Sequence, residues 1–101
     1  MNIEIKTKNL TLNTALEEFT KKRIKSLERF LENPELLLAE VELEKIGNKQ
    51  SKGNVFRAET QIQVKGKLLR AESTMDDLRK AIVDVKDSLQ IQIKKYREKR
   101  Q

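Results

Sequence analysis

Apolar residues recur along this chain with two different periods, and this change of period limits the fold more than any other feature. Four segments alternate apolar with polar residues, the pattern of strands buried on one face: residues 2–8, 39–44, 56–64 and 67–73. Two further segments, residues 14–31 and 78–97, repeat their apolar residues at helical spacing. The predicted order of elements is therefore β-α-β-β-β-α.

Residues with distinct backbone preferences mark the ends of these elements. Asn13 is the predicted N-cap of the first helix, and Asn33-Pro34 is expected to stop it, because proline lacks the N–H that a continuing helix needs. Residues 47–54 contain two glycines and no apolar side chain, which predicts a loop. Lys65-Gly66 predicts a tight hairpin turn. The segment from Thr74 to Asp77 resembles a capping box at the start of the second helix.

Short connections make the last three strands an antiparallel meander. A sheet with one apolar face must be covered, and the two helices are the only elements available. We therefore predict an α+β two-layer sandwich in a single domain, residues 1–101, with both helices packed on one face of a four-stranded sheet. The predicted core contains Ile3, Ile5, Leu16, Leu27, Val41, Leu43, Phe56, Ile62, Leu69, Ile82, Val85 and Leu89. The opposite face is expected to be solvated and acidic, carrying Glu40, Glu42, Glu44, Arg57, Glu59, Arg70 and Glu72.

The composition removes most catalytic chemistry. The 101 residues include no cysteine and no histidine, so disulfides, thiolate nucleophiles and the commonest general base and metal ligand are missing. The sequence also contains no glycine-rich phosphate loop and no carboxylates at metal-binding spacing. We predict that the protein is not an enzyme and that it uses no cofactor, metal or small-molecule substrate.

No segment is suited to a membrane. The N-terminal residues 1–8 alternate and lack the apolar run of a signal peptide, and the longest fully apolar run, residues 36–39, is far too short to span a bilayer. We expect a cytoplasmic protein with no membrane partner.

The charge favours a polyanionic partner. Twenty-two Lys and Arg against sixteen Asp and Glu give a net charge of +6, although a basic domain without such a partner is equally compatible with this number. Lys22, Lys25 and Arg29 share the predicted outward face of the first helix. On the second helix, cations and one glutamine follow a single flank of the apolar stripe: Arg79, Lys86, Gln90, Lys94 and Arg97. Two adjacent basic helices can track a phosphate backbone, while a Lys-rich face is also typical of a solvated surface.

Only four residues are aromatic: Phe19, Phe30, Phe56 and Tyr96. All four fall on the core stripes or faces of their predicted elements, Tyr96 with its hydroxyl toward water. This placement argues against recognition of single strands by base stacking. An RNA partner is expected to be contacted through its backbone and shape.

Two segments carry a resemblance to a known family. Residues 1–30 form a strand and an Asn-capped helix ending in Lys25-Ser26-Leu27-Glu28-Arg29-Phe30, and residues 70–99 hold a second pattern, matched by Asp77, Leu78, Ala81, Ile82, Leu89, Gln92, Ile93 and Lys95. The chain resembles the ribosome hibernation-promoting factors, or ribosome-associated inhibitor proteins, which also carry the name sigma-54 modulation protein. It departs from the family at Arg79, where Tyr is usual, and at Val83, where a second Asp is usual. We expect a short form without the C-terminal extension that pairs ribosomes in the long forms.

The resemblance implies a non-catalytic translation inhibitor. Such a protein binds ribosomal RNA of the small subunit in the channel of messenger and transfer RNA, promotes hibernation in stationary phase or stress, and is expected to be a monomer away from the ribosome. The RNA-binding residues carried over from the family are Lys22, Lys25, Arg29, Lys86, Lys94 and Lys95, with Arg79 as a charge-compatible replacement. Two alternatives stay open: a module that binds double-stranded RNA by shape, and a protein-interaction module that modulates transcription.

Overall fold

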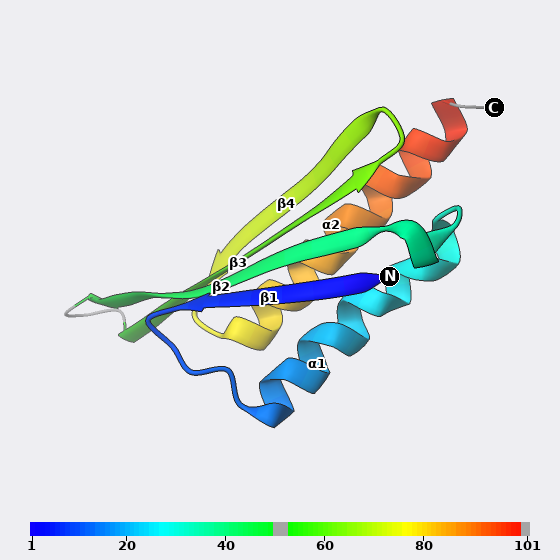
Figure 1. Ribbon diagram of the computed structural model, residues 1–101. Coiled ribbons are helices and arrows are strands. Elements are labelled where there is room, and N and C mark those ends of the chain that lie inside the picture. The colour runs from blue at the N-terminus through cyan, green and yellow to red at the C-terminus, as the bar shows by residue number, and fades with distance from the viewer. Residues whose placement is uncertain (50–52, 100–101) are drawn as a thin grey trace.

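Four strands form one mixed sheet in the computed structural model, which describes residues 1–49 and 53–99 (Figure 1). The elements follow the predicted order, with two short 3-10 helices added between the first helix and the second strand. They are β1 (Asn2–Lys8), α1 (Thr14–Lys25), η1 (Ser26–Phe30), η2 (Pro34–Leu36), β2 (Leu38–Lys49), β3 (Gly53–Val64), β4 (Lys67–Met75) and α2 (Leu78–Lys99). The predicted α+β class is confirmed.

The strands lie in the order β1-β2-β3-β4. β2, β3 and β4 form the predicted antiparallel meander, and Gly66 has the positive φ of 78° that the tight hairpin turn requires. β1 pairs in parallel with β2, with Ile3 opposite Ala39, so α1 is the crossover helix of a β-α-β unit. α1 and α2 run side by side in the same direction along one face of the sheet, which confirms the two-layer arrangement (Figure 1).

The core lies between the sheet and these two helices. Every predicted core residue except Phe56 is buried or packs against the buried cluster. Phe56 lies opposite Met75 at the end of β4, where the β2–β3 hairpin extends beyond the helices, so its side chain is only partly buried (Figure 1). A fully buried Thr20 was not predicted, and its hydroxyl donates to the Leu16 carbonyl at 2.8 Å.

The first helix is shorter than predicted. Its N-cap is confirmed, because the Asn13 side chain accepts the Leu16 N–H at 2.8 Å. The α-helix ends at Lys25, however, and the chain continues to Phe30 as a tighter 3-10 helix. At this junction the Ser26 hydroxyl donates to the Arg23 carbonyl at 2.6 Å, a local bond that competes with the helical pattern. Pro34 therefore begins η2 and does not terminate α1.

Two other boundaries were predicted wrongly. The predicted loop 47–54 is too long, because β2 continues to Lys49 through an irregularity in pairing between Lys45 and Gly47, and β3 already begins at Gly53. Residues 50–52 of that loop lie outside the described residues. Thr74 is not a cap, because it belongs to β4 and pairs with Arg57.

The start of α2 is capped by one residue alone. The Asp77 carboxylate accepts the N–H groups of Arg79 at 2.8 Å and of Lys80 at 3.4 Å. Asp77, which was predicted as the last residue of a capping box that begins at Thr74, is thus the N-cap of α2.

Candidate nucleic-acid interface

The outer face of the sheet holds a network of ion pairs centred on Arg57. Its guanidinium contacts carboxylates on β2, β3 and β4: Glu42 (2.9 Å), Glu44 (3.6 Å), Glu59 (3.1 Å) and Glu72 (2.8 Å). Arg70 pairs with two of the same carboxylates, those of Glu59 and Glu72. The hydrogen bond to Glu72 raises the pKa of Arg57 above its usual value, although partial burial acts in the opposite direction.

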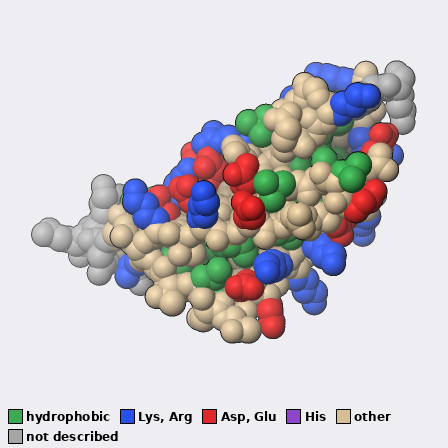
Figure 2. All heavy atoms as spheres, in the orientation of Figure 1, with side chains coloured by type: hydrophobic (Ala, Val, Ile, Leu, Met, Phe, Trp, Pro, Cys, Tyr) green, Lys and Arg blue, Asp and Glu red, His purple; other side chains and the backbone are tan. Residues whose placement is uncertain are grey.

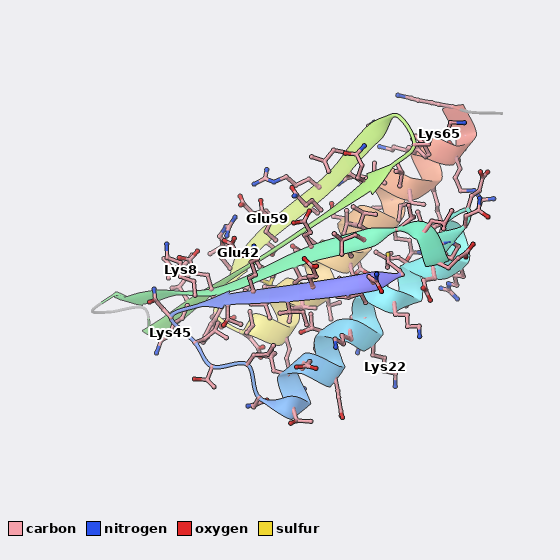
Figure 3. The ribbon with its side chains drawn as sticks, in the orientation of Figure 1. Lys8, Lys22, Glu42, Lys45, Glu59 and Lys65 are labelled. Atoms are coloured by element: carbon pink, nitrogen blue, oxygen red, sulfur yellow. The ribbon has the colours of Figure 1, made fainter. Side chains whose placement is uncertain are left out.

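This network confirms the predicted acidic, solvated face. Lys8 pairs with Glu44 of this network at 3.8 Å, so three cations face four carboxylates and the network has a net charge of −1. Figure 3 shows Glu42 and Glu59 on the strands of this face, and Figure 2 shows red and blue side chains interleaved over the sheet. The cations here are already paired, so the face is unsuited to a polyanion.

The cations predicted to bind RNA lie on the helical side instead. Six of the seven are exposed and form no ion pair with any carboxylate in residues 1–49 and 53–99: Lys22, Lys25, Arg29, Arg79, Lys94 and Lys95. Lys22 extends from α1 into solvent in Figure 3. The helical side therefore carries positive charge opposite an acidic sheet, and such a charge distribution orients a polyanion toward one side.

Two arginines from different helices meet on the ring of Phe19. The guanidinium carbon of Arg79, on α2, lies 4.8 Å from the ring centre, and that of Arg23, on α1, lies 5.1 Å from it. Both distances allow cation–π attraction. We call Phe19, Arg23 and Arg79 the Phe19 cluster. It concentrates two positive charges at one point of the seam between the helices.

A second cluster lies further along the same seam. Arg29 of η1 and Lys94 of α2 approach the ring centre of Phe30 to 4.7 and 5.0 Å, and we call these three residues the Phe30 cluster. The Arg97 guanidinium donates to the Phe30 carbonyl at 3.2 Å. Along the chain, six α-helical steps of 1.5 Å and five 3-10 steps of about 2.0 Å separate the two phenylalanines, a rise of about 19 Å. The seam thus presents two separate points of positive charge.

The predicted set is not brought together as a whole. Lys86 lies on the expected flank, but its ammonium is 2.8 Å from the Asp87 carboxylate and 3.4 Å from the Gln90 side-chain oxygen, and its side chain is only 17% exposed. Lys95 is turned about 100° from Lys94 around the helix. It lies three residues after Gln92, whose amide donates to the Arg70 carbonyl of β4 at 2.9 Å. The seam thus contains Arg29, Arg79 and Lys94 in contact with its aromatic rings.

Sequence reasoning missed two cations at this seam. Arg23 follows Phe19 by four residues on one helix, a spacing at which side chains meet, and this was the signal available for it. Arg97 was placed on the correct flank of the second helix but was not included among the RNA-binding residues. Its contact with Phe30 depends on how α2 packs against η1, which no local pattern contains.

No group of three or more acidic side chains in residues 1–49 and 53–99 is placed to hold a metal ion. Within the same ranges, no helix is both long and apolar enough to cross a membrane.

The fold agrees with three comparisons with known proteins. Residues 3–101 match the family model described as sigma 54 modulation protein / S30EA ribosomal protein. A ribosome hibernation promotion factor of Staphylococcus aureus (strain COL) is 30% identical over 97 residues, which are 96% of this chain and 48% of that protein. The chain therefore spans about half the length of this curated relative.

Two solved structures share the fold. The N-terminal domain of Protein Y from Thermus thermophilus superposes with a TM-score of 0.80 at 31% identity, over 95% of this chain and 99% of that one. A ribosomal subunit interface protein from Coxiella burnetii gives a TM-score of 0.75 at 19% identity, over 97% and 99% of the two chains.

Proposed function

Because the chain belongs to the sigma 54 modulation protein / S30EA ribosomal protein family, we propose that it binds the small ribosomal subunit and inhibits translation without catalysis. It occupies the channel of messenger and transfer RNA, excludes those RNAs sterically, and promotes ribosome hibernation in the cytoplasm during stationary phase or stress. Residues 1–101 act as one ribosome-binding domain, and the protein is a monomer when it is not bound.

The observation that carries this proposal is that cations paired with carboxylates lie on the sheet, whereas cations without carboxylate partners among the described residues lie at the seam between the helices. On the sheet, Arg57 and Arg70 are neutralised by carboxylates. On the seam between the helices, Arg79 and Lys94 contact aromatic rings and no carboxylate of the described residues. Phosphate contacts from such cations supply most of the affinity of a protein for an RNA backbone.

Sedimentation of the protein with purified ribosomal subunits tests the proposal. We expect co-migration with small subunits, and competition by messenger RNA. Binding to free duplex RNA without co-migration would instead support the alternative of a double-stranded-RNA binder. If the protein binds neither small subunits nor free duplex RNA, only the alternative of a protein-interaction module is left.

Two triple variants with the same net charge test which face of the protein binds ribosomal RNA. Lys22→Glu, Arg79→Glu and Lys94→Glu together lower the net charge from +6 to 0, and so do Lys6→Glu, Lys8→Glu and Lys67→Glu. All six residues are exposed, and among them only Lys8 pairs with a carboxylate of the described residues, that of Glu44 at 3.8 Å. We expect the helical set to abolish binding and translation inhibition, whereas the strand set slows association only. Equal loss in the two folded variants would contradict the assigned face.

A further inference from the structure

An open cavity of about 380 Å³ lies at the end of the seam, next to the Phe30 cluster. Its walls come from η1, η2, the β3–β4 hairpin and the last turns of α2. Figure 3 shows Lys65 of that hairpin beside the C-terminal part of α2. The apolar lining includes Phe30, Leu36, Leu37, Val64, Ile93 and Tyr96. A volume above about 300 Å³ is typical of sites that hold small organic groups.

Two aromatic rings line this cavity, and both are partly exposed. The Tyr96 hydroxyl donates to the Lys65 carbonyl, which fixes that ring against the hairpin. Leu36 also lines the cavity with 79% of its surface exposed, the largest exposure among the large apolar residues described. Such an opening suits a flat, apolar group that can contact ring faces.

The surroundings of the cavity are positively charged. Lys65 and Arg97 line it, against the single carboxylate of Glu32 among its lining residues. Arg29 and Lys94 lie over the Phe30 ring, so this ring joins the cavity to the Phe30 cluster. A ligand that places an apolar ring inside and negative charge outside therefore complements the site.

Asn33 adds hydrogen-bonding groups to the lining. It has a left-handed backbone with φ of 48°, and its side chain makes no capping bond to η2, which it precedes. A carboxamide carries two donors and an acceptor, the groups that pair with the edge of a base.

We propose that this cavity binds one unpaired RNA base against the Tyr96 ring and beside Phe30, with the flanking phosphates on Lys65, Arg97 and the cations of the Phe30 cluster. The inference rests on the proposed function, because it names how the same RNA is held at one end of the seam. It also changes the expectation from sequence that RNA is read through its backbone alone. An apolar peptide fits the walls but supplies no anion to the four cations, so a base with its flanking phosphates is the better occupant.

Intrinsic fluorescence of the protein measures occupancy of this cavity, because the chain contains one tyrosine, Tyr96, and no tryptophan. Tyr96 fluorescence is measured while the protein is titrated at low salt with a short single-stranded RNA. The matched probe is an abasic strand of the same length, which keeps the phosphates and lacks the bases. We expect saturable quenching by the RNA only. The RNA should bind about 5- to 150-fold more tightly than the abasic strand, the contribution of one base stacked on an aromatic ring.

Leu36→Glu should remove this advantage by placing a negative charge in the cavity lining. Ile46→Glu is the matched control, since Ile46 is also an exposed apolar residue and lies near the other end of β2. It should leave quenching and affinity unchanged. Equal quenching by the RNA and abasic strands, or equal behaviour of the two variants, would overturn the inference.

A photoreactive benzophenone side chain at position 36 tests the occupant in the complex with small subunits. We expect a crosslink to ribosomal RNA. A crosslink to a ribosomal protein would identify a peptide as occupant and refute the base, while the co-migration itself would still support the proposed function. Loss of co-migration in the unmodified protein would be a failure of the proposed function, separate from either quenching result.

Discussion

Binding to the small subunit should weaken steeply with salt, with a slope set by the cations of the two clusters. Arg23 and Arg79 at one ring, and Arg29 and Lys94 at the other, supply four positive charges without carboxylate partners among the described residues. Each phosphate contact contributes about −0.7 to −0.9 to the slope of log K against log salt concentration. These four contacts alone give a slope of about −2.8 to −3.6, so a fourfold rise from about 50 to 200 mM salt weakens binding by at least about 50- to 150-fold.

One variant and one control separate this explanation from bulk charge. Arg79→Ala removes a contact and should reduce the magnitude of the slope by about 0.7 to 0.9. Lys86→Ala removes the same formal charge from the same helix, but Lys86 already pairs with Asp87 at 2.8 Å. Its slope should match that of the parent protein. The assay is fluorescence anisotropy of labelled protein with purified small subunits at five salt concentrations.

The outcome that refutes the reasoning is an equal change of slope in the two variants. It would mean that each cation contributes through the overall field, whatever its local partner. A slope near zero in the parent protein would refute phosphate contacts altogether and favour recognition of a ribosomal protein surface.

Three further predictions concern the fold. Val85→Asp places an unpaired charge where the side chain is 1% exposed, and should cost several kcal/mol of unfolding free energy, so that the thermal transition is lost or falls sharply. Asn13→Ala removes the N-cap bond to the Leu16 N–H and should cost about 1 kcal/mol, seen as a melting temperature about 4–8 °C lower; an unchanged melting temperature would show that solvent replaces the cap. Arg57→Met leaves four neighbouring carboxylates without their central cation and should cost about 1–2 kcal/mol in urea unfolding at low salt, less at high salt; an equal loss at both salt concentrations would exclude repulsion as the cause.

The fold was predictable wherever the burial of one face decides the structure. On β4, Leu69, Ala71 and Ser73 alternate with charged residues, and all three are buried as expected. The end of α1 was not predictable in this way, because a local bond from Ser26 competes there with the helix. The extension of β2 and β3 into the polar segment was missed for a related reason: paired backbones need no apolar period to continue as strands.

The sequence predicted on which flank of the helix the cations of the candidate site lie, but not which groups they contact. Helical spacing placed Arg79, Lys86 and Arg97 on one flank of α2, and the structure keeps them there. Helical spacing contains no information on which groups each side chain contacts. Arg79 reaches a ring on α1, whereas Lys86 pairs with the next residue of its own helix. Which cations stay available to RNA therefore depends on packing between elements.

The same packing explains how a protein of moderate net charge can approach RNA in one preferred orientation. With 38% charged residues, a cation anywhere on this surface is expected to lie near a carboxylate, and on the sheet Arg57 and Arg70 do so. At the seam, Phe19 and Phe30 pack against the core and also contact cations, and those cations pair with no carboxylate of the described residues. The two rings thus stabilise the core and hold unpaired positive charge on one side. A net charge of +6 spread evenly would attract RNA without orienting it, whereas this distribution presents the helices first.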